Sequence, residues 1–280
     1  MSDVKIQKDS ITIKKKVREH YASAILEKST PSSGGCCSES SNHSCCNKSA
    51  QLYDDPAVFE LPAEVTDISF GCGDPVTLAS LQPGQTVLDL GSGGGIDCFL
   101  AAKKVGPEGH VIGVDMTPEM IERARENKTR LKADHVEFRL GEIEHLPVAD
   151  QSIDVVISNC VINLSVDKQQ VLNEVYRVLK PGGKLAVSDI VTQESLPEIL
   201  MEDLTAWAGC ISGALDVNEY VSIIEKAGFS KVEVRPVYFD DDMVKEAEKS
   251  LDKEKFAGLS RETIKKMIFS AKITAFKPVS

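Results

Sequence analysis

Short apolar runs alternate with longer amphipathic stretches through the middle of the chain. The apolar runs have the length and the Val, Ile and Leu content of buried strands, and the stretches between them show helical spacing. The predicted strands are residues 86–90, 110–115, 136–140, 153–158 and 184–188, and the predicted helices are residues 96–105, 117–131 and 168–179. This alternation predicts an α/β fold with a doubly wound, mostly parallel sheet covered on both faces.

Both ends of the chain depart from this alternation. Residues 4–28 carry apolar positions at helical spacing and predict an N-terminal helix. Residues 29–50 are rich in Ser, Gly, Asn and Cys, and they predict a flexible loop. Near the C-terminus, residues 232–238 and 267–276 predict two late strands. We expect these two strands to pair antiparallel at the edge of the sheet.

Composition and charge narrow the classes of function. The net charge is −11, whereas a nucleic-acid partner requires dense Lys and Arg. The basic stretch at residues 14–18 is interpreted as a solvated face of the N-terminal helix. No apolar run reaches the roughly 18 residues of a membrane span, and the first residues show no signal-peptide pattern. We therefore expect a cytoplasmic protein with neither nucleic-acid nor membrane partners, whose eight cysteines are mostly reduced.

A glycine-rich turn follows the first predicted strand. Residues 89–95 read Asp-Leu-Gly-Ser-Gly-Gly-Gly, and glycines at this spacing let a ligand touch the backbone of a strand-to-helix turn. Asp115 ends the next strand, where a carboxylate can accept two ribose hydroxyl groups. Glu142 follows the third strand, where it could accept a hydrogen bond from an adenine amino group. These positions predict a site for a nucleotide-like cofactor.

Together with Leu179-Lys180-Pro181-Gly182-Gly183, this set resembles the class I S-adenosylmethionine-dependent methyltransferases over about residues 76–192. The resemblance implies S-adenosylmethionine as the cofactor. The alternative, a nicotinamide-binding Rossmann unit, is disfavoured by the Pro-Gly-Gly turn and by the lack of obvious hydride-transfer residues. The cofactor contacts implied by the resemblance are Asp89, Gly91, Gly93, Asp115, Met116, Glu142, Ile143 and Asn159.

Three cysteines are placed so that each could reach the mouth of the glycine-rich loop. Cys72 lies in a glycine-flanked turn, Cys160 follows the fourth predicted strand, and Cys210 lies close to the single tryptophan. Thiolates are soft ligands and nucleophiles, so these positions suggest that a soft atom is held there. Cys98, on the helix after the loop, is instead interpreted as a small packed residue.

The segments around these three cysteines resemble the arsenite methyltransferases, and the resemblance extends over about residues 17–278. Its motifs are Phe70-Gly71-Cys72-Gly73-Asp74-Pro75, Asn159-Cys160-Val161-Ile162-Asn163-Leu164 and Gly209-Cys210-Ile211-Ser212-Gly213-Ala214. The resemblance implies that Cys72, Cys160 and Cys210 bind arsenic(III) as the substrate. It also implies an additional redox thiol among Cys36, Cys37, Cys45 and Cys46, and we include Cys45 and Cys46 with the catalytic residues.

The implied reaction is methyl transfer to trivalent arsenic, whose lone pair is the nucleophile and carries no proton. Such a reaction needs alignment rather than a general base. Because methyl transfer formally oxidises arsenic, thiols must reduce it again. The implied partners are arsenite, methylated trivalent arsenicals and a thiol reductant such as thioredoxin or glutathione. The loop at residues 36–46 is interpreted as a thiol relay, with a zinc site or an inert loop as alternatives.

The chain is thus expected to have three parts. Residues 1–75 hold the N-terminal helix and the Cys-rich loop, residues 76–192 form the cofactor-binding core, and residues 193–280 form a smaller α+β region that completes the arsenic site and the sheet edge. Two other functions stay open: methylation of a quinone or another small organic acceptor, and metalloid binding or sensing by thiols without methyl transfer.

Overall fold

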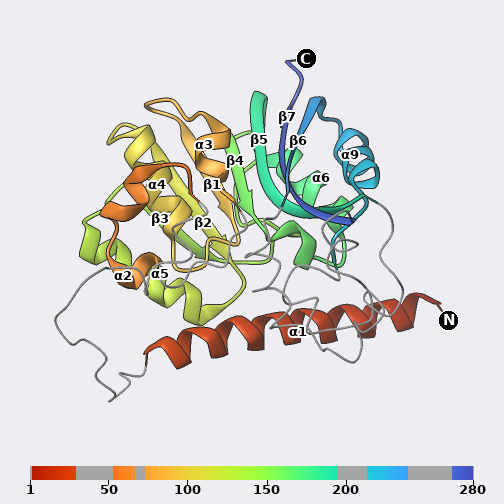
Figure 1. Ribbon diagram of the computed structural model, residues 1–280, viewed down its shortest axis with the longest axis horizontal. Helices are drawn as coiled ribbons and strands as arrows, with labels where there is room; N and C mark the ends of the chain where they lie inside the picture. The colour runs from red at the N-terminus through yellow and green to blue at the C-terminus, as the bar shows by residue number, and fades with distance from the viewer. Residues whose placement is uncertain (1, 30–52, 67–72, 194–212, 239–266, 280) are drawn as a thin grey trace.

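A single seven-stranded sheet with helices on both faces organises the protein (Figure 1). The computed structural model describes residues 2–29, 53–66, 73–193, 213–238 and 267–279. The helices are α1 (Ser2–Ser29), η2 (Pro56–Glu60), α2 (Ala63–Thr66), α3 (Pro75–Ala79), α4 (Ile96–Val105), α5 (Pro118–Leu131), η3 (Ile162–Leu164), α6 (Lys168–Val178) and α9 (Val217–Lys226). The strands are β1 (Thr86–Leu90), β2 (His110–Asp115), β3 (Val136–Leu140), β4 (Ile153–Asn159), β5 (Leu179–Thr192), β6 (Ser230–Val237) and β7 (Ile268–Phe276).

The strand order is β3-β2-β1-β4-β5-β7-β6. Strands β1 to β5 pair in parallel, and β7 pairs antiparallel with both β5 and β6. The predicted doubly wound parallel sheet and its antiparallel edge are therefore confirmed. The chain moves outward from β1 in one direction through β2 and β3, and in the other direction through β4 and β5. Ligands of such sheets bind where the direction reverses, which here is between β1 and β4.

Two hydrophobic layers cover the sheet. On one face, α3, α4 and α5 pack against the strands through residues such as Phe99, Ile121 and Phe138. On the other face, α6 and α9 pack through residues such as Leu172 and Tyr220. Because both faces are covered, the central strands are apolar along nearly their whole length, as the sequence pattern indicated. The expected division of the chain into three parts, with boundaries after residues 75 and 192, stays a prediction.

Strand β5 begins earlier than the sequence pattern predicts. Helix α6 ends at Val178, and β5 already pairs at Leu179, opposite Ile153. The register then shifts, and the next pair joins Val155 to Lys184. The Pro-Gly-Gly turn thus lies within the irregular first part of β5, where Gly182 has a positive φ of 81°. The predicted strand at residues 184–188 was too short because a turn signal does not exclude such an irregularity.

The N-terminal helix α1 packs beside α5, where Ile25 and Tyr21 contact Met120. Lys14 of α1 forms an ion pair of 2.7 Å with Glu142 and one of 3.2 Å with Glu144. The interpretation of the basic stretch as a solvated face is therefore wrong for Lys14. In the described ranges, neither α1 nor another helix is long and apolar enough to span a membrane.

One buried polar pair attaches α9 to the sheet. The Tyr220 hydroxyl donates a hydrogen bond of 2.9 Å to Asp189 Oδ2 on β5, and both side chains are fully buried. Burial raises the pKa of Asp189 to about 7, and the hydrogen bond from Tyr220 opposes that rise. The carboxylate therefore depends on this hydroxyl whenever it is ionised.

We predict that Tyr220→Phe lowers the free energy of unfolding by about 1–3 kcal/mol, and more at pH 8 than at pH 5. Because an unfolded Asp titrates near pH 4 and Asp189 near pH 7, the folded state loses stability as the pH rises between these values. Removal of the Tyr220 hydroxyl raises the pKa of Asp189 in the folded state further. The loss of stability therefore continues to higher pH in Tyr220→Phe. Chemical denaturation at both pH values tests this.

Tyr176→Phe is the matched control, because Tyr176 packs against the same hydrophobic core and contacts no buried carboxylate within the described residues. It should change stability little and without dependence on pH. An equal loss for Tyr220→Phe at pH 5 and pH 8 would contradict the assigned role of the hydroxyl.

Candidate active site

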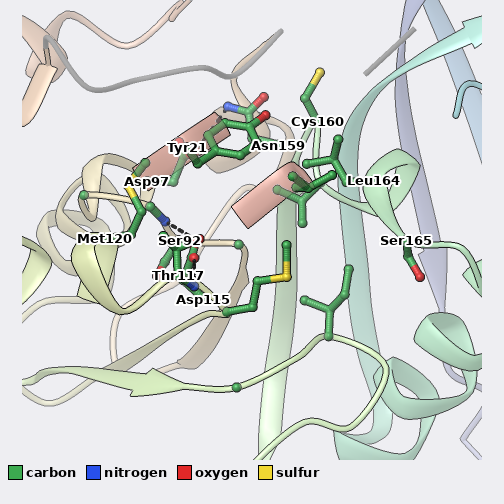
Figure 2. A pocket seen from close by; sticks show the side chains of 18 of the residues that line it. Tyr21, Ser92, Asp97, Asp115, Thr117, Met120, Asn159, Cys160, Leu164 and Ser165 are labelled. Atoms are coloured by element: carbon green, nitrogen blue, oxygen red, sulfur yellow. Dashed lines mark hydrogen bonds between the residues drawn. The ribbon is translucent and has the colours of Figure 1, made fainter. Parts of the chain in front are cut away.

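A pocket opens at the carboxyl ends of β1, β2 and β4, where the order of the sheet reverses (Figure 2). It holds about 960 Å³ of space, counted with its open mouth. Its walls come from the glycine-rich loop after β1, the ends of β2 and β4, the turn after β3 and the inner face of α1. The volume is large enough for a nucleoside-sized ligand.

The glycine-rich loop forms one wall by bringing its bare backbone to the pocket. Gly91, Gly93 and Gly95 have positive φ values of 64°, 50° and 96°. A Cβ atom on Gly91 would lie 2.4 Å from a methyl carbon of Val161. Only glycine therefore fits this turn, and the loop can approach a ligand closely, as predicted.

Asp115 lies at the end of β2 with its carboxylate already held by backbone groups. Its Oδ2 accepts a hydrogen bond of 3.0 Å from the Gly93 amide, and its Oδ1 accepts one of 2.8 Å from the Thr117 amide. Burial raises the pKa of Asp115, while these amides favour its charged form. The predicted ribose acceptor lines the pocket and is fixed in orientation.

Asp97, in the first turn of α4, is a pocket residue that the sequence reasoning missed. Its side chain is 5% exposed, and its Oδ1 has no hydrogen-bond partner within the described structure. Ser92, on the loop, also keeps its Oγ buried without a partner there. Buried polar atoms normally have partners, so these two oxygens are unusual, and they lie within the wall of the pocket rather than on its surface.

Asn159 ends β4 and joins several segments through one carboxamide. Its Nδ2 lies 2.8 Å from the Gly73 carbonyl oxygen, 3.1 Å from Asp97 Oδ2 and 3.4 Å from the Tyr53 hydroxyl oxygen. Gly73 directly follows Cys72 in the sequence, and Cys160 directly follows Asn159. The carboxamide therefore links the chain next to two predicted arsenic ligands to the wall of the pocket.

Cys160 lines the pocket in a strained backbone conformation. Its φ is 59°, in the left-handed region that residues other than glycine rarely adopt. Its amide donates a hydrogen bond of 2.8 Å to the Ser188 carbonyl oxygen, which fixes the turn. The residue is 4% exposed and is disulfide-bonded. Strain of this kind is often kept at functional positions, and here it occurs at a residue that lines the pocket.

Other predicted cofactor residues lie in different places. Met116 and Ile143 line the pocket. Glu142 is not among the lining residues, and its side chain is 47% exposed and pairs with Lys14, which does line the pocket. Asp89 lies behind the loop, where it accepts a hydrogen bond of 3.3 Å from the Cys98 thiol.

Cys98 itself is buried and free, in agreement with its interpretation as a packed residue. Burial raises the pKa of its thiol well above the ordinary value, as does the nearby Asp89. The thiol is therefore kept protonated and unreactive.

The other predicted thiols, namely Cys36, Cys37, Cys45, Cys46, Cys72 and Cys210, lie outside the described residues. Within the described ranges, no group of three or more His, Cys, Asp or Glu side chains could hold a metal ion. Cys160 is therefore the one predicted arsenic ligand that the described part of the chain positions.

Comparison of the chain with known proteins identifies its relatives. Residues 81–228 match the model of a methyltransferase domain. The arsenite methyltransferase of Halobacterium salinarum is 52% identical over 203 residues, which are 72% of this chain and 51% of that protein. The human arsenite methyltransferase is 35% identical over 82% of this chain and 59% of its own length. The chain thus spans between half and two thirds of these curated relatives.

A solved structure gives the same assignment at fuller coverage. The crystal structure of CrArsM, an arsenic(III) S-adenosylmethionine methyltransferase from Chlamydomonas reinhardtii, matches with a TM-score of 0.62 and 34% identity. The match covers 79% of this chain and 72% of that one. On the domain match, the relatives and this structure together, the chain belongs to the family of arsenite S-adenosylmethionine methyltransferases.

Proposed function

We propose that this protein transfers methyl groups from S-adenosylmethionine to trivalent arsenic held by cysteine thiolates, and so yields methylated arsenicals. The observation that carries the proposal is the position of Cys160, a cysteine, in the lining of a methyltransferase cofactor pocket. A soft ligand at the end of β4 suits a soft acceptor atom better than a carbon or oxygen nucleophile.

The residues of the pocket fit S-adenosylmethionine, which supplies an electrophilic methyl group on a sulfonium sulfur. Asp115 is oriented to accept the ribose hydroxyl groups, and the glycine-rich loop leaves room for the amino-acid part. The carboxylates of Asp97 and Asp115 both line the pocket, and their negative charge favours a cation.

The arsenic site in this proposal consists of Cys160, Cys72 and Cys210. Three thiolates bind trivalent arsenic in a pyramid and leave its lone pair free to attack the methyl carbon. No proton has to be removed from that lone pair. Consistent with this, no histidine lines the described part of the pocket. The enzyme's task is then to hold arsenic in line with the methyl group and the sulfonium sulfur.

The reaction also needs a supply of electrons in this proposal. When the lone pair forms the new arsenic–carbon bond, arsenic is formally oxidised from the trivalent to the pentavalent state. Two thiolates that form one disulfide return two electrons and restore trivalent arsenic. Cys45 and Cys46 are proposed as relay thiols, and thioredoxin or glutathione as the class of external reductant.

A direct test is incubation of the reduced protein with arsenite, a thiol and S-adenosylmethionine labelled on the methyl group. Labelled methylarsenicals are expected. If the protein binds the cofactor but methylates only a quinone or another organic acceptor, it is a methyltransferase of small organic acceptors and not of arsenic. Tight arsenite binding with no transfer to any acceptor would favour the thiol sensor.

We predict that Cys160→Ser abolishes methylation of arsenite while cofactor affinity stays within about twofold. Serine keeps the size of the side chain but removes the soft ligand. The same outcome is expected for Cys210→Ser. Labelled methyl transfer and calorimetry measure the two properties. Cys98→Ala is the matched control, and turnover should persist in it because Cys98 is packed behind the loop. Undiminished turnover in Cys160→Ser would remove this residue from the ligand set.

We predict that Asp115→Ala weakens cofactor binding far more than arsenite binding. Two charge-assisted hydrogen bonds to ribose are each worth about 1.5–3 kcal/mol. Calorimetry with S-adenosylmethionine measures the loss. Asp134→Asn, which alters an exposed aspartate after α5, should leave the affinity unchanged. An affinity for Asp115→Ala equal to that of the wild type would refute the ribose contact.

We predict that Cys72→Ser impairs turnover of arsenite more than turnover of trivalent monomethylarsenic. A methyl group occupies one arsenic valence, so the methylated substrate can use only two protein thiolates, which we assign to Cys160 and Cys210. Initial rates on both substrates test this. An equal loss on both would contradict the dispensability of Cys72, and no loss on either would remove it from the mechanism.

A further inference from the structure

The short stretch that follows β4 has one face on the pocket and another inside the protein. Four of its residues line the pocket, namely Cys160, Val161, Leu164 and Ser165 (Figure 2). The two residues between them, Ile162 and Asn163, are fully buried and do not belong to the lining. The contacts that hold the turn at Cys160 therefore include groups behind the pocket.

Asn163 extends the pairing of β5 beyond the end of β4. The parallel ladder ends at the pair Asn159–Ser188, after which the Cys160 amide donates a hydrogen bond of 2.8 Å to the Ser188 carbonyl oxygen. Carbonyl groups two residues apart on a strand point to the same side, so the Ile190 carbonyl also faces the turn. Asn163 Nδ2 donates a hydrogen bond of 2.6 Å to this carbonyl oxygen. One side-chain amide therefore takes the place of the next bond of the ladder.

The turn at Cys160 needs such support because its backbone is strained. A φ of 59° is unfavourable for a residue with a Cβ atom, and it persists only where neighbouring contacts fix the chain. Before the turn, the Asn159 carboxamide donates to Asp97 in the wall of the pocket. After the turn, the Asn163 carboxamide donates to the sheet. The strained residue thus lies between two buried carboxamides.

The backbone of Asn163 has a second support on the same strand. Burial raises the pKa of Asp189 to about 7, and the Tyr220 hydroxyl and the Asn163 amide oppose that rise. The side chain of Asn163 meets Ile190, and its main chain meets the carboxylate of the residue before it. Asn163 is therefore itself fixed to β5.

Resting on the proposed function, we propose that Asn163 is a positioning residue that holds Cys160 in its left-handed conformation at the pocket. Because Asn163 does not belong to the lining of the pocket, it acts through the turn and not on the substrate. Loss of its carboxamide frees the chain after Cys160, and the backbone relaxes toward an unstrained φ. The thiolate that holds arsenic then moves relative to the methyl group, and the misalignment slows the transfer.

Asn127 on α5 provides a matched control for a buried carboxamide. Both side chains are fully buried, and each donates through Nδ2 to a backbone carbonyl oxygen while its Oδ1 has no partner in the described structure. Asn127 donates over 3.1 Å to Gly94 of the glycine-rich loop, which forms a different wall of the pocket. Asn163→Ala and Asn127→Ala therefore separate a general loss of stability from an effect on Cys160.

The first test measures steady-state methylation of arsenite and calorimetric binding of S-adenosylmethionine with the reduced full chain. Asn163→Ala should lower kcat about 10- to 100-fold, because a displacement of about 1 Å has such an effect, while cofactor affinity stays within about twofold. Asn127→Ala should do the reverse, with about tenfold weaker cofactor binding and a kcat at saturating cofactor within about twofold of the wild type.

The second test detects strain at residue 160 without arsenic. Glycine adopts a positive φ at little cost, whereas alanine does not. In the otherwise wild-type protein, Cys160→Gly should therefore have a folding equilibrium constant about fivefold larger than that of Cys160→Ala. In combination with Asn163→Ala, this ratio should fall to about one, because the relaxed turn no longer imposes the left-handed conformation. In combination with Asn127→Ala, it should stay at about fivefold. Chemical denaturation under reducing conditions measures each constant.

Three results would overturn the inference: an undiminished kcat in Asn163→Ala, a loss of cofactor affinity that matches the loss of kcat, and a glycine-to-alanine ratio that Asn163→Ala leaves unchanged. If Asn163→Ala does not fold, Asn163→Ser, whose hydroxyl retains a hydrogen-bond donor, is judged by the same criteria. The comparison at residue 160 involves no arsenic, so it decides whether Asn163 holds the turn even if the wild type does not methylate arsenite. Such a failure would refute the proposed function and leave the support of the turn by Asn163 standing.

Discussion

The carboxamide of Asn159 is the contact on which the geometry of the site depends. It lies where the order of the sheet reverses, and its nitrogen meets a backbone carbonyl, a buried carboxylate and a tyrosine hydroxyl within 3.4 Å. These three acceptors come from segments that are far apart in the sequence. One amide group therefore sets the position of the Cys160 turn, of the chain after Cys72 and of the pocket wall at Asp97.

The same region concentrates acidic groups in a place where burial disfavours charge. Burial raises the pKa values of Asp89, Asp97 and Asp115, and the hydrogen bonds that each carboxylate accepts come from neutral groups. A protein gains no stability from such an arrangement on its own. It becomes favourable when a cation enters, so the electrostatics of the pocket suit a sulfonium cofactor, while the thiol of Cys160 suits a soft acceptor.

The sequence predicted those parts of this structure that depend on local patterns. The boundaries of β1 to β4 followed from apolar runs, and the glycine-rich loop followed from spacing, because only glycine fits the backbone at Gly91. Strand β5 was predicted too short and helix α9 was not predicted, since a register shift and a hydrogen bond between Asp189 and Tyr220 are not visible in local periodicity. Asp97 and Lys14 were missed as pocket residues for the same reason. Their roles depend on partners more than 60 residues away, namely Asn159 for Asp97 and Glu142 for Lys14.

We propose that Cys160 and two further thiolates hold arsenic beside the cofactor. X-ray absorption at the arsenic edge, on reduced protein loaded with one equivalent of arsenite, tests this most directly. We predict a shell of three sulfur neighbours and no oxygen neighbour in the wild type, with one sulfur lost in Cys160→Ser. A shell that contains oxygen in the wild type, or a shell unchanged by Cys160→Ser, would contradict it.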